Sequence, residues 1–317
     1  MTTTLRDHLA EYLAMRRELG YRLDKLELLA GQFCDWLTAA DKTTFTIADA
    51  VIWARLPGEA DPTWWALRLG AVRTFAAYLQ AIGVDVQVPP RGMLPVRTPR
   101  CLTPYIYSQQ DLNLLLEACP RVFTRELVTA TMRTVIALLA ATGMRIGEAL
   151  RLRPADIDPS AGVLTVRATK NGTDRLVALH DSTTAALTAY QMLPARTATR
   201  PQADGPLLVT TGGTGYHRAT IETHFTNVVA AAGLPQRGRS RPTLHALRHT
   251  FATAHMAAAY RAGTDPQRTL TLLATWLGHT SAAHTYWYLT ATPELMALAA
   301  NRVENANRLQ NNELSTP

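Results

Sequence analysis

A proline-dense segment around residue 90 places the strongest limit on how this chain folds. Five prolines lie between residues 84 and 104, at Pro89, Pro90, Pro95, Pro99 and Pro104. Proline fixes φ and lacks a backbone N–H, so this density prevents a regular helix or strand. We therefore predict an extended linker over residues 84–103, which separates a first domain (1–83) from a second domain (104–317). The length of 317 residues, about twice that of a usual domain, agrees with two domains.

Residues 1–83 carry apolar side chains at the spacing of α-helices. The pattern marks four helical stretches, over residues 5–19, 26–37, 46–53 and 65–79. Thr46 is a suitable N-cap for the third stretch, and the apolar stripe of the fourth begins near Trp65. The first domain is therefore predicted to be a small all-helical bundle.

The second domain combines helices with one hairpin. Helices are predicted over residues 107–118 and 132–142, where an almost wholly apolar run ends at Gly143. Residues 162–168 and 175–179 alternate as strands around the turn KNGT, and Asn-Gly is the strongest short hairpin signal. Helices follow over residues 183–190, 220–232, 245–261, 268–277 and 293–309. The predicted fold class is mostly α, an all-α bundle followed by an α+β domain with a small antiparallel sheet.

The charge of the chain favours a polyanionic partner. Lys and Arg number 32 against 25 Asp and Glu, which gives a net charge of +7. The only lysines are Lys25, Lys42 and Lys170, and none follows Lys170. A lysine kept at a predicted hairpin tip in a lysine-poor half of the chain is a candidate functional residue.

The cysteines and the N-terminus indicate an intracellular protein. Cys34, Cys101 and Cys119 are odd in number and widely spaced, which fits neither a disulfide framework nor a CxxC metal site. The N-terminal sequence MTTTLRDHLAEYL lacks the apolar core of a signal peptide, and no apolar run approaches the ~18 residues of a membrane span. We expect a cytoplasmic protein that meets the DNA of the nucleoid.

Four separated motifs carry the chemistry of the second domain. They are TGMRIGEALRL with Arg145 and Glu148, TKNGTDR with Lys170, LHALRHTFAT with His245 and Arg248, and LGHTSAAHTYWYL with His279 and Tyr288. In this order, and with Tyr288 nine residues after His279, they resemble the tyrosine recombinase (phage integrase) family. The resemblance covers residues 104–290, and the helical first domain is similar to that family's core-binding domain.

The resemblance implies an enzyme that breaks and rejoins DNA strands without ATP, a cofactor or a metal. Arg145 and Arg248 would clamp the nonbridging oxygens of the scissile phosphate, where negative charge develops during attack. Tyr288 would be the nucleophile. Because a phenol is a good leaving group, a 3′-phosphotyrosine keeps the bond energy for rejoining.

Proton transfer and positioning are implied for the other motif residues. Lys170 would be the general acid for the departing 5′-oxygen, and His245 would assist proton transfer at the phenol. His279 would hydrogen-bond the scissile phosphate. Glu148, one turn after Arg145, is expected to orient that arginine.

The residues leave alternatives open at two of these positions. Tyr286 lies two residues before Tyr288 and is the rival nucleophile, although the spacing from His279 favours Tyr288. Arg175 lies in the same hairpin as Lys170 and competes with it for the role at the leaving oxygen.

A metal site is the alternative for the histidines. His245 and His249 are four residues apart on a predicted helix, and His255 could be a third ligand. No HExxH motif is present, however, and attack by a phenol between two arginines needs no Lewis acid. We therefore expect no metal.

Arginines outside the motifs are candidates for contact with the DNA backbone. They lie in the first domain, in the linker and in the basic run QRGRSRP: Arg68, Arg73, Arg91, Arg97, Arg100, Arg237, Arg239 and Arg241. A charged outer face or a solvated loop explains the same residues without DNA.

The predicted function is site-specific recombination of double-stranded DNA. The resemblance implies that four protomers join two DNA sites and pass through a Holliday junction, with accessory proteins as further partners. The helix over residues 293–309 could dock on a neighbouring protomer or pack on its own domain. Two other functions stay open: a type IB topoisomerase and a noncatalytic DNA-binding protein of the same fold. The setting, whether phage, transposon or chromosome resolution, is also open.

Overall fold

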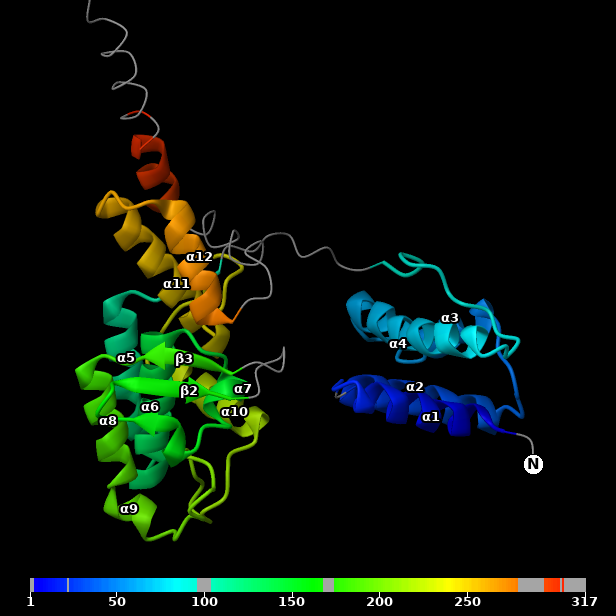
Figure 1. Cartoon of the computed structure of the whole chain (residues 1–317), viewed down its shortest axis with the longest axis horizontal. Helices are drawn as coiled ribbons and strands as arrows, with labels where there is room; N and C mark the ends of the chain where they lie inside the picture. The colour runs from blue at the N-terminus through cyan, green and yellow to red at the C-terminus, as the bar shows by residue number, and fades with distance from the viewer. Residues whose placement is uncertain are drawn as a thin grey trace, which may run out of the picture. The chain divides into compact units, whose positions relative to one another are not determined.

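The computed structural model describes residues 3–21, 23–95, 104–167, 174–278, 294–302 and 304. The chain divides into two units, Met1–Cys101 and Leu102–Pro317. Figure 1 shows helices alone in the first unit and all of the labelled strands in the second.

The described residues of the first unit form four helices: α1 (Leu5–Glu18), α2 (Asp24–Ala39), α3 (Ile47–Arg55) and α4 (Pro62–Ala81). Helix α3 begins with a capping box, in which the Thr46 side chain accepts from the Asp49 N–H and the Asp49 carboxylate accepts from the Thr46 N–H. Pro62 takes the first position of α4, where no backbone N–H is needed. Local sequence signals therefore set the starts of α3 and α4.

Aromatic rings form the core of the first unit. The Phe33 ring lies 4.9 Å from that of Phe45 and 5.1 Å from that of Trp53, measured between centroids. Leu69 and Val72 of α4 are fully buried against them. The apolar stripes seen in the sequence thus face one common core.

Arg68 belongs to this core. It is 8% exposed, its guanidinium lies 3.8 Å from the centroid of the Trp53 ring, and its Nη2 donates to the Trp53 carbonyl at 2.9 Å. Burial also lowers the pKa of the Arg68 guanidinium. The structure therefore corrects the expectation that Arg68 contacts DNA, because α4 turns this side chain inward.

The proline-rich segment starts as part of the first unit. Residues 84–95 contain no helix or strand, yet Val86 and Leu94 are buried in the helical core. Arg73 of α4 donates to the carbonyls of Pro89 and Pro90 at 2.7 and 2.9 Å. The described half of the expected linker is therefore packed on the bundle, because apolar residues between the prolines find a place in its core.

The second unit is arranged around α6 (Glu126–Thr142), whose side chains Met132, Val135 and Ile136 are buried. Helices α5 (Gln109–Val122), α8 (Asp181–Gln191) and α11 (Leu244–Arg261) pack against it. The other helical segments are α7 (Ile146–Ala149), η1 (Pro154–Asp156), α9 (Pro194–Thr197), α10 (Arg218–Ala231), α12 (Pro266–Leu277) and residues 294–302. A helix that is apolar on most sides is thus covered on most sides.

A three-stranded antiparallel sheet lies beside these helices. Its order is β1 (Ile157–Asp158), β2 (Val163–Val166) and β3 (Arg175–Ala178). Leu164 and Val177 are paired and fully buried, while Arg175, at the start of β3, pairs with Val166. Strand β3 also contacts α12, so this register carries Arg175 to the end of α12.

The predicted fold class is confirmed: the chain is mostly helical, with an all-α first unit and a small antiparallel sheet in the second. The long stretch between Arg248 and His279 consists mainly of α11 and α12, which lie side by side (Figure 1). Leu295, in the helical residues 294–302, is 1% exposed and packs on the core that these two helices form. Within the described ranges, no helix is long and apolar enough to cross a bilayer.

Candidate active site

The first wall of the candidate site is the turn that ends α6. Gly143 has φ +65°, and a Cβ built on it would lie 2.6 Å from the Phe251 side chain and 2.9 Å from that of Leu277. Only glycine fits both this left-handed conformation and this space. The chain therefore turns sharply after α6, and Arg145 becomes the residue that precedes α7.

Glu148 joins two arginines at this turn. Its carboxylate accepts from the Arg145 N–H and from Arg145 Nη1, both at 2.9 Å. It also accepts from Arg175 Nη1 at 3.2 Å and from Arg175 Nη2 at 2.7 Å. The Glu148 side chain is 3% exposed, that of Arg175 11% and that of Arg145 33%. Burial alone would raise the pKa of Glu148, but the bonds from Arg175 and Arg145 outweigh it and hold that pKa at about 2.

This pKa predicts an acid-sensitive second unit. The Glu148 pKa is about 2 in the folded chain against an ordinary 4.5, so as the pH falls this carboxylate is protonated first in the unfolded chain. The stabilisation that it gives the folded chain is therefore complete above pH 4.5 and is lost as the pH falls towards 2. At about 1.4 kcal/mol per pKa unit the contribution is about 3 kcal/mol. Denaturant unfolding of the wild type and of Glu148→Gln between pH 6 and pH 3 measures it. The two free energies of unfolding should converge as the pH falls, and parallel curves would contradict the assignment.

Arg248 joins the end of α6 to the end of α12. It is 2% exposed, and it donates from Nη1 to the Gly143 carbonyl at 2.9 Å and from Nη2 to the Leu277 carbonyl at 2.8 Å. Trp276 links the same two ends, because its Nε1 donates to the Thr142 carbonyl at 2.9 Å. The two carbonyls therefore fix the orientation of the Arg248 guanidinium next to the turn that carries Arg145.

His245 lies one turn before Arg248 on α11. The residue is exposed, yet partial loss of hydration and the nearby charges of Arg248, Arg145 and Arg218 lower the pKa of its imidazole. The lowered pKa favours the neutral imidazole, which is the form that accepts a proton. The His249 ring stands edge-on to it, with 4.6 Å between centroids.

No metal cluster appears among the described side chains: they contain no group of three or more His, Cys, Asp or Glu placed to hold an ion. His255 lies against Phe251, with 4.1 Å between the ring centroids, and its Nδ1 is 2.8 Å from the Phe251 carbonyl oxygen. That contact occupies His255 within its own helix.

The structure brings together Arg145 and Glu148 from one motif with His245 and Arg248 from another, about 100 residues later in the sequence. Lys170, His279 and Tyr288 lie outside the described residues, as do Arg97, Arg100 and Tyr286. From the sequence, Arg175 is a rival to Lys170 for the role at the leaving oxygen. Its guanidinium is instead held by Glu148 and by the Trp276 carbonyl at 2.8 Å, so it is not placed to protonate a leaving oxygen. No local sequence pattern predicts this contact, because the pairing of β2 with β3 brings Arg175 to the distant helix α12.

The other predicted DNA-contact arginines divide into two groups. Arg237 donates to the Ile106 carbonyl at 2.7 Å and to the Asp111 carboxylate at 2.8 Å, so it fastens residues 104–111 to the loop before α11. Arg73 holds the proline segment in a similar way. Arg91, Arg239 and Arg241 are exposed, and the Arg237 side chain is 47% exposed despite its two contacts.

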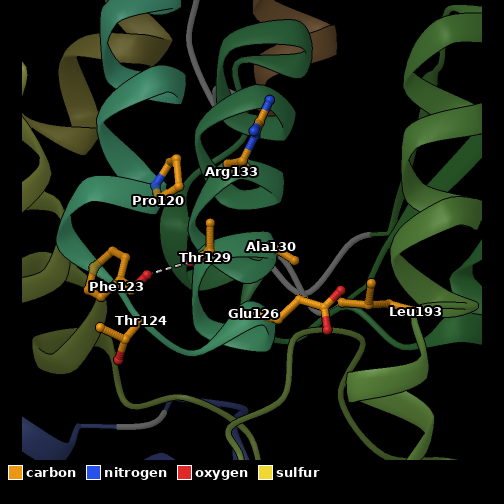
Figure 2. A pocket seen from close by; sticks show the side chains of 8 residues that line it. All are labelled: Pro120, Phe123, Thr124, Glu126, Thr129, Ala130, Arg133 and Leu193. Carbon is orange, nitrogen blue, oxygen red and sulfur yellow. Dashed lines mark hydrogen bonds between the residues drawn. The ribbon is translucent and has the colours of Figure 1, made fainter.

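A pocket of about 450 Å³ opens at the other end of α6, between Phe123, Glu126, Thr129, Arg133 and Leu193 (Figure 2). Arg133 is nine residues before Thr142, which is about 14 Å along a helix. Figure 2 shows the Thr129 hydroxyl bonded to the Phe123 carbonyl across its wall. This pocket is therefore separate from the arginine cluster, which consists of Arg145, Arg175 and Arg248 and lies at the Thr142 end of α6.

Comparisons with known proteins show the family of this chain. Residues 106–294 match the model of the phage integrase family. The putative integrase/recombinase y4rB of Sinorhizobium fredii is 40% identical over 309 residues, which cover 95% of this chain and 98% of the relative. Tyrosine recombinase XerC of Agrobacterium fabrum is 31% identical over 221 residues, 69% of this chain and 64% of the relative.

Solved structures show the same fold. A XerH site-specific recombinase bound to its palindromic difH substrate has a TM-score of 0.61 at 18% identity and covers 89% of this chain and 80% of that chain. The Tn1549 transposon integrase in complex with transposon right end DNA has a TM-score of 0.61 at 16% identity, with 95% and 99% covered. The family match, the near full-length relative and the fold agree: this chain belongs to the phage integrase family and is a tyrosine recombinase.

Proposed function

We propose that this protein cleaves and rejoins double-stranded DNA at specific sites through a covalent 3′-phosphotyrosine. The observation that carries the proposal is the convergence of Arg145, Arg248 and His245 at the end of α6, where the Arg145 and Arg248 charges act on the His245 imidazole. Two guanidiniums beside an imidazole whose pKa is lowered suit a reaction in which a phosphate gains negative charge while a nucleophile loses a proton.

In the proposed reaction the Tyr288 oxygen attacks the scissile phosphorus, and the bond from phosphorus to the 5′-oxygen breaks. His245 takes the phenol proton, and Lys170 gives a proton to the departing 5′-oxygen. Arg145 and Arg248, with a hydrogen bond from His279, stabilise the charge on the nonbridging oxygens. A 5′-hydroxyl of the partner strand then attacks the phosphotyrosine, the phenol leaves, and a phosphodiester is restored.

Contacts with the DNA backbone are proposed for the exposed Arg91, Arg239 and Arg241 and for Arg97 and Arg100, with the first unit as a DNA-binding domain. Arg237 and Arg73 act by holding the chain segments that carry these arginines. The solved relatives bound to difH and to transposon-end DNA support duplex DNA as the partner. Family resemblance supports a homotetramer on two sites, exchange through a Holliday junction, and movement of a transposon or other integrating element.

The polarity of cleavage tests the reaction. Duplexes tiled from both flanks of the gene, each with a nick close to the candidate site, trap the covalent intermediate because the short leaving strand diffuses away. The released strand should carry a 5′-hydroxyl, so polynucleotide kinase should label it without phosphatase treatment. A released 5′-phosphate, or cleavage without attached protein, would contradict the proposed reaction.

A further inference from the structure

Arg175 contacts both Glu148, which also binds Arg145, and the end of α12, which also binds Arg248. Its Nη1 and Nη2 donate to the two oxygens of Glu148, and its Nε donates to the Trp276 carbonyl at 2.8 Å. We propose that Arg175 is a positioning residue for strand cleavage, which aims Arg145 through Glu148 and is itself anchored by its bond to the end of α12. The inference rests on the proposed function and names a further residue on which that reaction depends.

The geometry requires an arginine at this position. A planar guanidinium can meet both oxygens of a carboxylate and still direct Nε along a third line, whereas an ammonium is a single point donor. Gly278 follows Leu277 with φ +67°, and a Cβ built there would lie 3.0 Å from Arg175 Nη1. The end of α12 is thus shaped to let the guanidinium lie against its backbone.

The charge balance around Glu148 also requires a positively charged side chain at position 175. Glu148 is almost fully buried and bonded to Arg145, so on its own it would offset the charge that Arg145 brings to a phosphate. Arg175 supplies the second positive charge on this carboxylate. With Arg175 present, Glu148 can orient Arg145 while the cluster of Arg145, Arg175 and Glu148 keeps a net positive charge.

The test compares single-turnover cleavage of trapped duplexes by four full-length proteins: wild type, Arg175→Met, Arg145→Met and the double variant. Arg175→Met should cleave about 100-fold more slowly with unchanged DNA affinity, because a displacement of about 1 Å in a catalytic group costs about that much. Arg145→Met should lose about 100-fold to 1,000-fold. The double variant should be no slower than Arg145→Met, because Arg175 acts through Arg145.

A methylphosphonate at the scissile position adds a readout that a merely structural role would not move. It removes a nonbridging negative charge, so the defect of Arg175→Met should largely disappear on that substrate. Arg167→Met is the matched control, because Arg167 follows β2 and pairs with Asp156 outside the cluster; it should cleave like the wild type. If Arg175→Met does not fold, Arg175→Lys replaces it, and it should show a smaller defect with the same dependence on Arg145.

Different results overturn different statements. Wild-type rates in Arg175→Met, or losses that multiply in the double variant, would overturn the positioning role and leave the reaction standing. A wild type that forms no covalent product with any duplex would instead overturn the proposed function, and this inference with it.

Discussion

Replacement of Arg248 by methionine should slow DNA cleavage by at least about 100-fold and destabilise the second unit by about 2–6 kcal/mol. The side chain is 2% exposed and holds the carbonyls of Gly143 and Leu277. Without it, two buried carbonyls lose their donor, at a cost of about 1–3 kcal/mol each. The site also loses one of the two guanidiniums proposed to clamp the phosphate, which is worth at least about 100-fold in rate.

Two further variants separate stability from chemistry. Arg145→Met should cleave about 100-fold to 1,000-fold more slowly with less effect on stability, because Arg145 is one-third exposed and Glu148 keeps its bonds to Arg175. Arg261→Met should change neither quantity, because Arg261 lies at the exposed end of α11 and pairs with Glu294 on the surface. Calorimetry measures the stability change, at roughly 2–4 °C per kcal/mol for a unit of this size. An Arg248→Met protein that melts and cleaves like the wild type would contradict the role of this side chain in the fold and in the site.

Much of the architecture follows from local signals in the sequence. The Thr46 cap, the apolar run that ends at Gly143 and the Asn-Gly turn are each readable within a few residues, and the elements that they predict are present. These signals work because capping and periodicity depend on neighbours in the chain. The fold class was predictable for this reason.

What the sequence could not supply depends on contacts between distant residues. The two-residue strand β1 is too short to leave a periodic pattern and exists because β2 pairs with it. The Arg68 side chain points inward because it packs on the Trp53 ring. The proline segment packs on the first unit because Val86 and Leu94 are buried in its core. Secondary-structure propensity predicts none of these three features, because tertiary packing determines them.

The site shows the same division. Motif order selected Arg145, His245 and Arg248, and the structure gathers them. Glu148 was expected to orient Arg145, and it does contact it. The second partner of Glu148, Arg175, was missed because 27 residues and a β-hairpin separate the pair. A buried carboxylate beside one arginine is a reason to search for a second, since an almost fully buried charge needs full pairing.

Substitution of Tyr288 by phenylalanine should have the largest effect of all, the complete loss of covalent attachment to DNA. The change removes one oxygen and keeps the ring, so DNA binding and folding should persist. No other group in the proposed reaction can form the bond to phosphorus. The Tyr286→Phe variant is a control of equal chemistry two residues away, and it should still attach.

The measurement that tests this account most directly is a denaturing gel of wild type, Tyr288→Phe and Tyr286→Phe after incubation with nicked duplexes from the flanks of the gene. Peptide mapping of the adduct then identifies the attached tyrosine. The account predicts an adduct for the wild type and Tyr286→Phe, attached at Tyr288, and none for Tyr288→Phe. An adduct that persists in Tyr288→Phe, or that is lost only in Tyr286→Phe, would contradict it.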